Sequence, residues 1–96
     1  MDQTKALVAI QKIIRRSLPD KNFRIFLFGS RAGGFARHFS DFDIGIAGQT
    51  RVPTKQLNQI QSDLEDSDIP YKVEVVDFID AEDSFKNLAL KHTLPL

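Results

Sequence analysis

The sequence predicts a small α/β (α+β) domain in which helices flank a three-stranded sheet. Three short stretches rich in β-branched and aromatic residues have the length of strands. The segments around them carry apolar residues at helical spacing. The chain of 96 residues is long enough for one modest core, so we expect residues 1–96 to form a single domain.

The first predicted helix covers residues 4–17, and the first strand covers residues 23–28. Both alternating sets of side chains in this strand are largely apolar, which predicts that both of its faces are covered. Pro19 to Asn22 is a turn cluster between the two elements. The stripe that marks the helix as amphipathic consists of Leu7, Ile10, Ile14 and Leu18, with Ala6 and Ile13 beside it.

The rest of the chain predicts two more strands and three more helices. Pro53 fits the first turn of the longer helix between the strands. That helix has a buried stripe at Leu57, Ile60 and Leu64, and the last helix has an apolar side at Phe85, Leu88 and Ala89. The apolar tail at residues 93–96 is either a docking segment or an early stop. The predicted elements are a short helix at 31–36, strands at 41–47 and 71–78, the helix after Pro53, and a helix from 80 or 81.

A glycine–serine pair directly after the first strand is a candidate phosphate site. Gly29 can adopt a positive φ without steric cost and lets a ligand approach the backbone. Ser30 can cap the short helix that follows. The free N–H groups and the dipole at the start of that helix would attract an anion.

Two aspartates open the second strand and are candidate metal ligands. Side chains alternate along a strand, so Asp41 and Asp43 share one face with Gly45, while the apolar residues between them face the core. Two carboxylates on one face repel each other unless a cation lies between them. Mg²⁺ or Mn²⁺, which bind carboxylates, waters and phosphates, suit such ligands. Together the two motifs predict a metal–nucleotide site.

The spacing of these motifs resembles the signature of the polymerase-beta-type nucleotidyltransferases. Gly29-Ser30 is followed by ten residues, Arg31 to Ser40, and then by Asp41-x-Asp43. The fuller string, with Arg31-Ala32, Gly34 and Ser40-Asp41-Phe42-Asp43-Ile44, is similar to the minimal nucleotidyltransferases (MNT), which are often encoded beside a HEPN-domain protein. The resemblance covers nearly the whole chain and implies the mixed sheet of the nucleotidyltransferase fold. The alternative is a glycine–serine turn and a solvated acidic strand start.

Enzymes of the resembling superfamily use a third acidic residue on a later strand, and the third predicted strand offers Glu74 and Asp77. Alternation places them on opposite faces, with Glu74 beside Lys72. The string from Val73 to Asp77 is similar to the Val-Asp-Leu-Val-Asp of many relatives, whose first acid belongs to the active site. We therefore favour Glu74 over Asp77, although Glu in place of Asp is a departure from the family. The alternatives are an ion pair of Glu74 with Lys72 and a loop cap at Asp77.

The resemblance implies a Mg²⁺- or Mn²⁺-dependent transfer of a nucleotidyl group, AMP from ATP, to an acceptor hydroxyl. Asp41, Asp43 and Glu74 would be catalytic, and these three or Asp77 would bind metal. Gly29 and Ser30 would bind phosphates, with Arg31 or Arg37 adding a charge-assisted contact. The implied acceptor is a tyrosine of a HEPN toxin, and the chain would be its antitoxin.

The resemblance leaves other functions open. The chain could be an inactive nucleotide-binding module that neutralises a HEPN partner by covering it. Transfer to a small molecule and polymerisation of nucleic acid are disfavoured, because the sequence predicts no second domain. His38 could be a general acid or base, but a single histidine in a loop is usually solvated.

Composition adds limits to these predictions. Lysine plus arginine and aspartate plus glutamate each number 13, yet before Asp41 eight basic residues stand against two acidic ones. A basic first half beside two carboxylates suits a polyphosphate held against metal ions. The sequence has no cysteine, no apolar run of membrane-spanning length and no signal-peptide pattern, so we expect a cytoplasmic protein. A small domain is marginally stable, so association with itself or with a partner would stabilise it.

Overall fold

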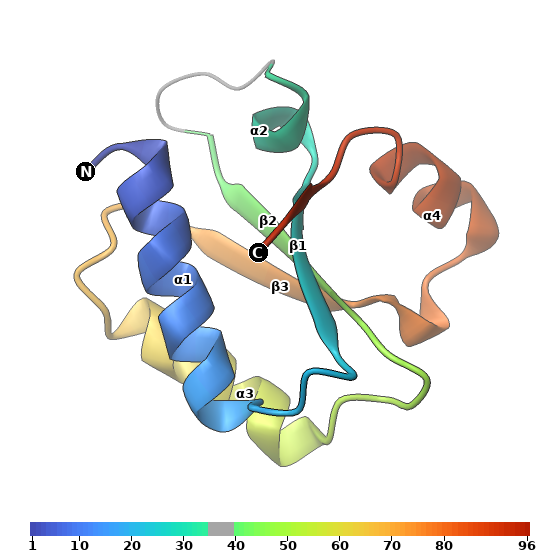
Figure 1. The fold of residues 1–96 in the computed structure, drawn as a ribbon, viewed down its shortest axis with the longest axis horizontal. Coiled ribbons are helices and arrows are strands. Elements are labelled where there is room, and N and C mark those ends of the chain that lie inside the picture. Colours follow the sequence, from blue (N-terminus) through green and yellow to red (C-terminus); the bar gives the residue numbers. More distant parts are fainter. Residues whose placement is uncertain (35–39) are drawn as a thin grey trace.

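The computed structural model describes residues 1–34 and 40–96, and its centre is a mixed sheet with helices on both faces (Figure 1). Strands lie in the order β3-β2-β1-β4. The central strands β1 (Arg24–Phe28) and β2 (Phe42–Ala47) are antiparallel. β3 (Val73–Asp77) is parallel to β2, and β4 (Leu94–Pro95) is antiparallel to β1. The mixed α/β fold is confirmed, whereas the prediction of three strands is wrong by one.

The extra strand β4 is made by the apolar tail. Leu94 pairs with Leu27, and the Leu96 N–H donates to the Ile25 carbonyl at 2.9 Å. The Leu96 side chain packs against the main core, whereas Leu94 is 44% exposed. The tail therefore docks onto the edge of its own sheet.

The helices are close to the predicted ranges, and the differences have local causes. α1 spans Gln3–Ser17, and α3 spans Thr54–Glu65 with Pro53 as its N-cap residue, one position before the first turn. α4 spans only Asp83–Ala89, because residues Phe78–Asp80 form a separate 3₁₀ helix, η1, capped by the Asp77 side chain. No helix within residues 1–34 and 40–96 has the length and apolar composition needed to cross a membrane.

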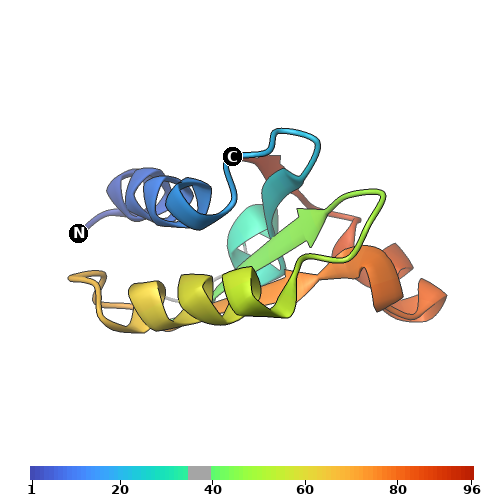
Figure 2. The ribbon, with the colours of Figure 1, turned by 90° about the horizontal axis from the view of Figure 1, so that it is seen from below.

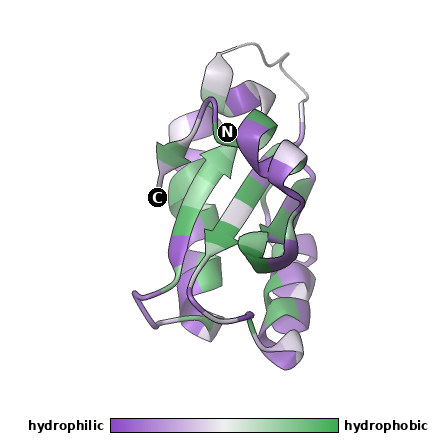
Figure 3. Cartoon of the chain, turned by 90° about the vertical axis from the view of Figure 1, so that its right-hand side faces the viewer, coloured by the Kyte–Doolittle hydropathy of each residue, from purple (hydrophilic) through white to green (hydrophobic). Residues whose placement is uncertain are grey.

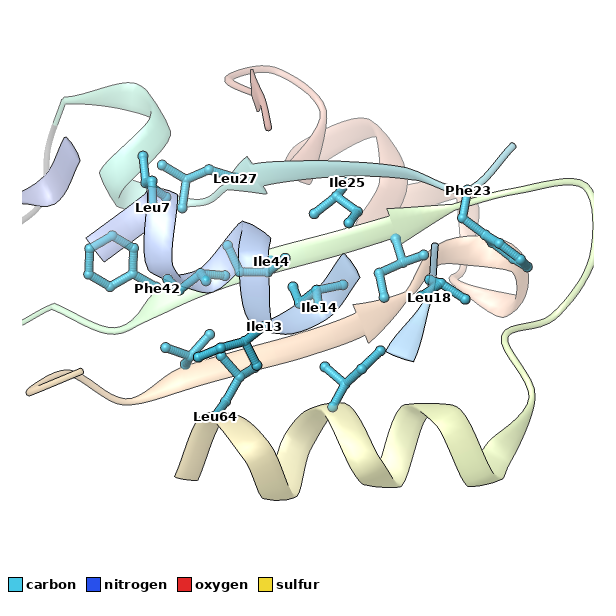
Figure 4. Packing of buried hydrophobic residues seen from close by; sticks show 14 of the residues in the cluster. Leu7, Ile13, Ile14, Leu18, Phe23, Ile25, Leu27, Phe42, Ile44 and Leu64 are labelled. Atoms are coloured by element: carbon cyan, nitrogen blue, oxygen red, sulfur yellow. The ribbon is translucent and has the colours of Figure 1, made fainter. Parts of the chain in front are cut away.

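One face of the sheet packs against α1 and α3 and forms the main core (Figures 2 and 4). The predicted stripes of both helices are confirmed there: Ile10, Ile14 and Ile60 are fully buried, and Leu64 is nearly so. Strand residues of this face are equally enclosed. Ile25, Leu27, Phe42, Ile44 and Ile46 expose at most 2% of their surface. In Figure 3 the strands are correspondingly green along much of their length.

The opposite face of the sheet carries a smaller aromatic cluster. Phe26 and Phe28 of β1 meet the ring of Phe78 edge-on, with centroids 5.0 and 5.1 Å apart. Ala89 of α4 is buried against this cluster, so both faces of β1 are covered, as predicted. The predicted apolar side of α4 is only partly buried, because Leu88 is 68% exposed.

Gly45 of β2 lies beneath this aromatic cluster, and its lack of a side chain is required there. A Cβ at this position would overlap the ring of Phe26 and lie 2.7 Å from the Phe78 ring. We expect Gly45→Ala to lower the free energy of unfolding by about 1–3 kcal/mol, the usual cost of overpacking. Urea denaturation measures this loss.

A compensating variant tests the cause of that loss. Leucine at position 26 lacks the outer ring atoms that a Cβ would meet, so adding Phe26→Leu to Gly45→Ala should cost less than the two single changes together. Strict additivity of the two losses would contradict the overlap.

Candidate active site

Three carboxylates lie on one face of the sheet where β2 and β3 begin. Asp43 and Glu74 are direct partners in the parallel β2–β3 register, so their side chains point to the same face. Asp41 precedes β2 by one residue and shares that face by alternation. The structure thus brings together Asp41, Asp43 and Glu74, which stand on two different elements.

The backbone of Gly29 closes over the carboxylate of Asp43. Gly29 has φ 76°, in the left-handed region that favours glycine, and a Cβ there would lie 2.5 Å from Asp43 Oδ2. The adjacent Phe28 is the register partner of Asp43 across β1 and β2. The group that approaches the Gly29 backbone here is an internal carboxylate, and the approach of a ligand stays a prediction.

Ser30 differs from its prediction in one respect. α2 spans Ser30–Gly33 with Gly29 as its N-cap residue, so Ser30 is the first helical residue and its side chain makes no capping bond. α2 ends at Gly33 because Gly34 takes a left-handed conformation, φ 77°, and Gly34 N–H donates to the Ser30 carbonyl. The Ser30 side chain is exposed beside Gly29, where a ligand could reach it.

The clustered charges change the ionisation of the site. The pKa of Asp43 is raised, first by burial and then by the negative charges of Glu74 and Asp41. Lys72 supplies a positive charge on the same face: its Nζ lies 3.0 Å from Glu74 Oε1. The hydrogen bond to Glu74, and next the charges of Glu74 and Asp41, raise the pKa of Lys72. Both partners of this ion pair are at least half exposed, so solvent weakens it.

The donor atoms suit a hard divalent cation in part. Within the described part of the chain, no three histidine, cysteine, aspartate or glutamate side chains are arranged so that they could hold a metal ion. Mg²⁺ needs fewer protein ligands, because one or two carboxylates together with waters and substrate phosphates suffice. Asp41 and Asp43 meet that requirement, and a cation beside them would relieve the repulsion that, after burial, raises the pKa of Asp43.

Arg31 contacts other parts of the protein. Its Nε donates to the Ser40 carbonyl at 2.8 Å, and its Nη1 donates to Gln3 Oε1 at 3.3 Å. Its guanidinium lies over the rings of Phe42 and Tyr71, 4.0 and 4.9 Å from their centroids. The predicted phosphate contact of Arg31 stays a prediction. Two other candidates, Arg37 and His38, lie outside the described residues.

Asp77 has a structural environment that matches the alternative interpretation, a cap of the following loop. Its carboxylate accepts hydrogen bonds from the N–H of Val52 at 2.8 Å and from the N–H of Ile79 at 3.1 Å. These bonds tie the loop after β2 to η1, on the opposite side of β3 from Glu74. The role of Asp77 as a metal ligand stays a prediction, and Glu74 is the acid that lies beside Asp43.

Several residues that surround the site are not predicted from the sequence. The sequence assigns no role to Gln3 and Tyr71, although the structure places both against Arg31. The sequence marks Lys72 only as a partner for Glu74, whereas the charge of Asp41 also raises the pKa of Lys72. The signal for Lys72 was present, because residues two apart on a strand share a face. No local pattern marks Gln3, which is 28 positions from Arg31.

A small mixed sheet with paired carboxylates at its end and a glycine–serine turn beside them defines a domain of the nucleotidyltransferase type. The family model described as "Polymerase beta, Nucleotidyltransferase" matches residues 9–95. The chain therefore belongs to the polymerase beta nucleotidyltransferase family.

The chain is also similar to individual proteins. It is 24% identical over 89 residues to the probable protein adenylyltransferase MntA of Haemophilus influenzae (strain ATCC 51907 / DSM 11121 / KW20 / Rd), covering 93% of this chain and 76% of the relative. A chain in the crystal structure of a toxin–antitoxin with AMP-PNP is 21% identical in sequence, with a TM-score of 0.69, and the match covers 90% of this chain and 68% of that one. A chain in the structure of a tri-AMPylated Shewanella oneidensis HEPN toxin in complex with MNT antitoxin is 18% identical, with a TM-score of 0.71, and the match covers 98% of this chain and 71% of that one. These two likenesses show a shared fold.

The contact between Gly29 and Asp43 predicts a specific loss in Gly29→Ala. The strain of a left-handed alanine should lower the free energy of unfolding of this variant by about 1–2 kcal/mol, and the overlap with Asp43 should lower it by about 1–3 kcal/mol more. The displaced carboxylate should weaken the binding of Mn²⁺ and ATP, measured by calorimetric titration. Gly34→Ala is the matched control, because Gly34 has φ 77° and no atom of the described residues lies within 4 Å of its Cβ position. Equal losses in the two variants would contradict the contact.

The raised pKa of Asp43 predicts a pH-dependent stability. Between the usual pKa and the raised pKa, the native protein binds more protons than the unfolded chain, so its free energy of unfolding falls as pH rises. Above the raised pKa the penalty is complete, and there Asp43→Asn should stabilise the metal-free protein; below the usual pKa the gain should vanish. Urea midpoints measured with a chelator in both pH ranges test this. A gain that persisted at low pH would have another cause.

Proposed function

We propose that this protein transfers an adenylyl group from ATP to a hydroxyl group of a HEPN-domain partner and thereby acts as an antitoxin. The observation that carries the proposal is the meeting of Asp41, Asp43 and Glu74 on one face, beside the Gly29–Ser30 turn, whose serine is exposed. Membership of the nucleotidyltransferase family supports the reaction class. The similar MntA of Haemophilus influenzae is named a probable protein adenylyltransferase, and a similar fold occurs beside an AMPylated HEPN toxin. A reaction that uses ATP fits a cytoplasmic protein.

Each residue of the site has a role in this proposal. Asp41 and Asp43 would hold Mg²⁺ or Mn²⁺, which when bound supplies positive charge against the triphosphate. Gly29 offers its backbone, and Ser30 its exposed hydroxyl, to the phosphates. The recessed Asp43 is fixed by Gly29 above it, so its carboxylate is positioned before the nucleotide arrives.

The transfer is a displacement at the α-phosphorus of ATP. The acceptor oxygen forms a bond to this phosphorus, the bond to the β-phosphate oxygen breaks, and pyrophosphate leaves with that electron pair. Glu74 takes the acceptor's proton as general base. Because Lys72 bonds to Oε1 of Glu74, the proton would go to Oε2, or to Oε1 once the ammonium group has moved away.

A second function, binding without catalysis, is favoured by that same ion pair. The charge of Glu74 is partly balanced by Lys72, and no three-ligand metal group occurs among residues 1–34 and 40–96. A protein with this fold could still bind ATP and neutralise a HEPN partner by covering it.

Glu74→Gln separates these two functions. The change keeps the shape of the side chain but removes the base and one negative charge, so partner and ATP should still bind while transfer falls by about 10²–10⁴-fold. The assay is mass spectrometry of a HEPN-domain protein that binds this chain, incubated with the chain, ATP and Mg²⁺. Asp77→Asn is the control on the opposite face, and it should lose stability at the Val52 and Ile79 contacts with a milder loss of transfer.

The outcomes assign the function. A larger loss of transfer for Asp77→Asn than for Glu74→Gln would mean that the wrong carboxylate was chosen. Undiminished transfer by Asp43→Asn would overturn the site itself. If the wild type transfers nothing to a bound HEPN partner yet still neutralises it, the binding function replaces the catalytic one.

A further inference from the structure

Arg31 lies on the side of β2 opposite to the three carboxylates. Its guanidinium stacks 4.0 Å from the centroid of the Phe42 ring, and Phe42 points into the main core (Figure 4). Alternation places Asp41 and Asp43, the neighbours of Phe42, on the other face. Arg31 therefore approaches the strand from behind the site.

The contacts of Arg31 join segments that are distant in the sequence. The guanidinium bonds to Gln3 at the start of α1 and stacks on Tyr71, just before β3. Tyr71 also packs edge-on against Phe42, with centroids 5.2 Å apart, and its hydroxyl donates to the Met1 carbonyl at 2.6 Å. Arg31, which belongs to α2, thus joins this helix to three other segments: the start of α1, the start of β2 and Tyr71 before β3.

The bond that matters for the site is the one to the Ser40 carbonyl. Ser40 directly precedes Asp41, and the Arg31 Nε donates to its oxygen at 2.8 Å. On the other side of Asp41, the Phe42 N–H donates to the Lys72 carbonyl at 2.9 Å. The peptide groups flanking Asp41 are therefore held from both directions, which limits where an otherwise exposed aspartate can point.

We propose that Arg31 is a positioning residue, which fixes Asp41 next to Asp43 by holding the Ser40 carbonyl and the Phe42 and Tyr71 rings. The consequence for metal binding rests on the proposed function, whereas the ordering of the Ser40–Phe42 segment does not. A planar guanidinium can stack on two rings and donate in two directions at once. The ammonium of lysine keeps the charge but lacks that fixed fork of donors, so Arg31→Lys separates position from charge.

Arg15 provides a matched control for this substitution. It too is held by carbonyl groups, since its Nη1 donates to Leu18 and Asp20 and its Nη2 donates to Phe23 at 2.9 Å. These bonds lie near the start of β1, whose first residue pairs with Ala47 at the far end of β2 from Asp41. Arg15→Lys removes a comparable set of bonds without touching the site.

The experiment compares the two lysine variants with the wild type in three measurements. Urea midpoints should fall in both variants. Hydrogen exchange of the Phe42 amide should become faster in Arg31→Lys only. Calorimetric titration with Mn²⁺ alone should give an affinity about tenfold lower or more in Arg31→Lys, the loss typical when a group that orients a metal ligand is removed.

The outcomes distinguish the positioning role from the alternatives. Unchanged exchange at Phe42 in Arg31→Lys overturns the proposal, whether or not the wild type binds Mn²⁺. Unchanged Mn²⁺ affinity with a raised KM for ATP would assign Arg31 to the phosphates instead. An equal loss of Mn²⁺ affinity in Arg15→Lys would reduce the effect to general stability. Faster exchange in Arg31→Lys, combined with a wild type that binds no Mn²⁺, would support the positioning role and contradict the proposed metal site.

Discussion

The contact between the Gly29 backbone and the Asp43 carboxylate is the constraint on which the rest of the site depends. The approach requires a glycine with positive φ, and so it requires a turn where β1 ends. It also requires that β1 and β2 are antiparallel neighbours with Phe28 opposite Asp43. The parallel register of β3 then sets Glu74 beside the same carboxylate. The position of Glu74 is therefore set by the sheet topology. The Gly29–Ser30 turn and the two aspartates come from the neighbouring strands β1 and β2.

This arrangement concentrates negative charge where water is partly excluded. Burial and the neighbouring acids both disfavour the ionised form of Asp43, and Lys72 balances part of the charge through Glu74. Such a site lowers the stability of the free protein and gains from any cation that binds the native state alone. Burial and the crowding of the acids together cause this instability, and a bound cation would relieve it.

Much of this architecture follows from patterns within single segments. Alternation identified the face that carries Asp41 and Asp43, and it separated Glu74 from Asp77. What could not be predicted depends on contacts between segments. The partners of Arg31 come from α1, from the residue before Asp41 and from the segment just before β3. Asp77 accepts a hydrogen bond from the N–H of Val52, which is 25 positions away. β4 escaped prediction because two paired residues, one of them a proline, are too few to show a period.

β4 also affects how molecules of this protein meet one another. An uncovered strand presents rows of donors and acceptors that can pair with another chain and start aggregation. Here the tail occupies the free side of β1, and Pro95 has no N–H to offer outward. At the other border of the sheet, Gln61 of α3 donates to the Val73 carbonyl at 3.0 Å and so occupies an acceptor of β3. The β4 margin is thereby made a poor template for the strand of a second molecule, and the β3 margin has one acceptor fewer to offer.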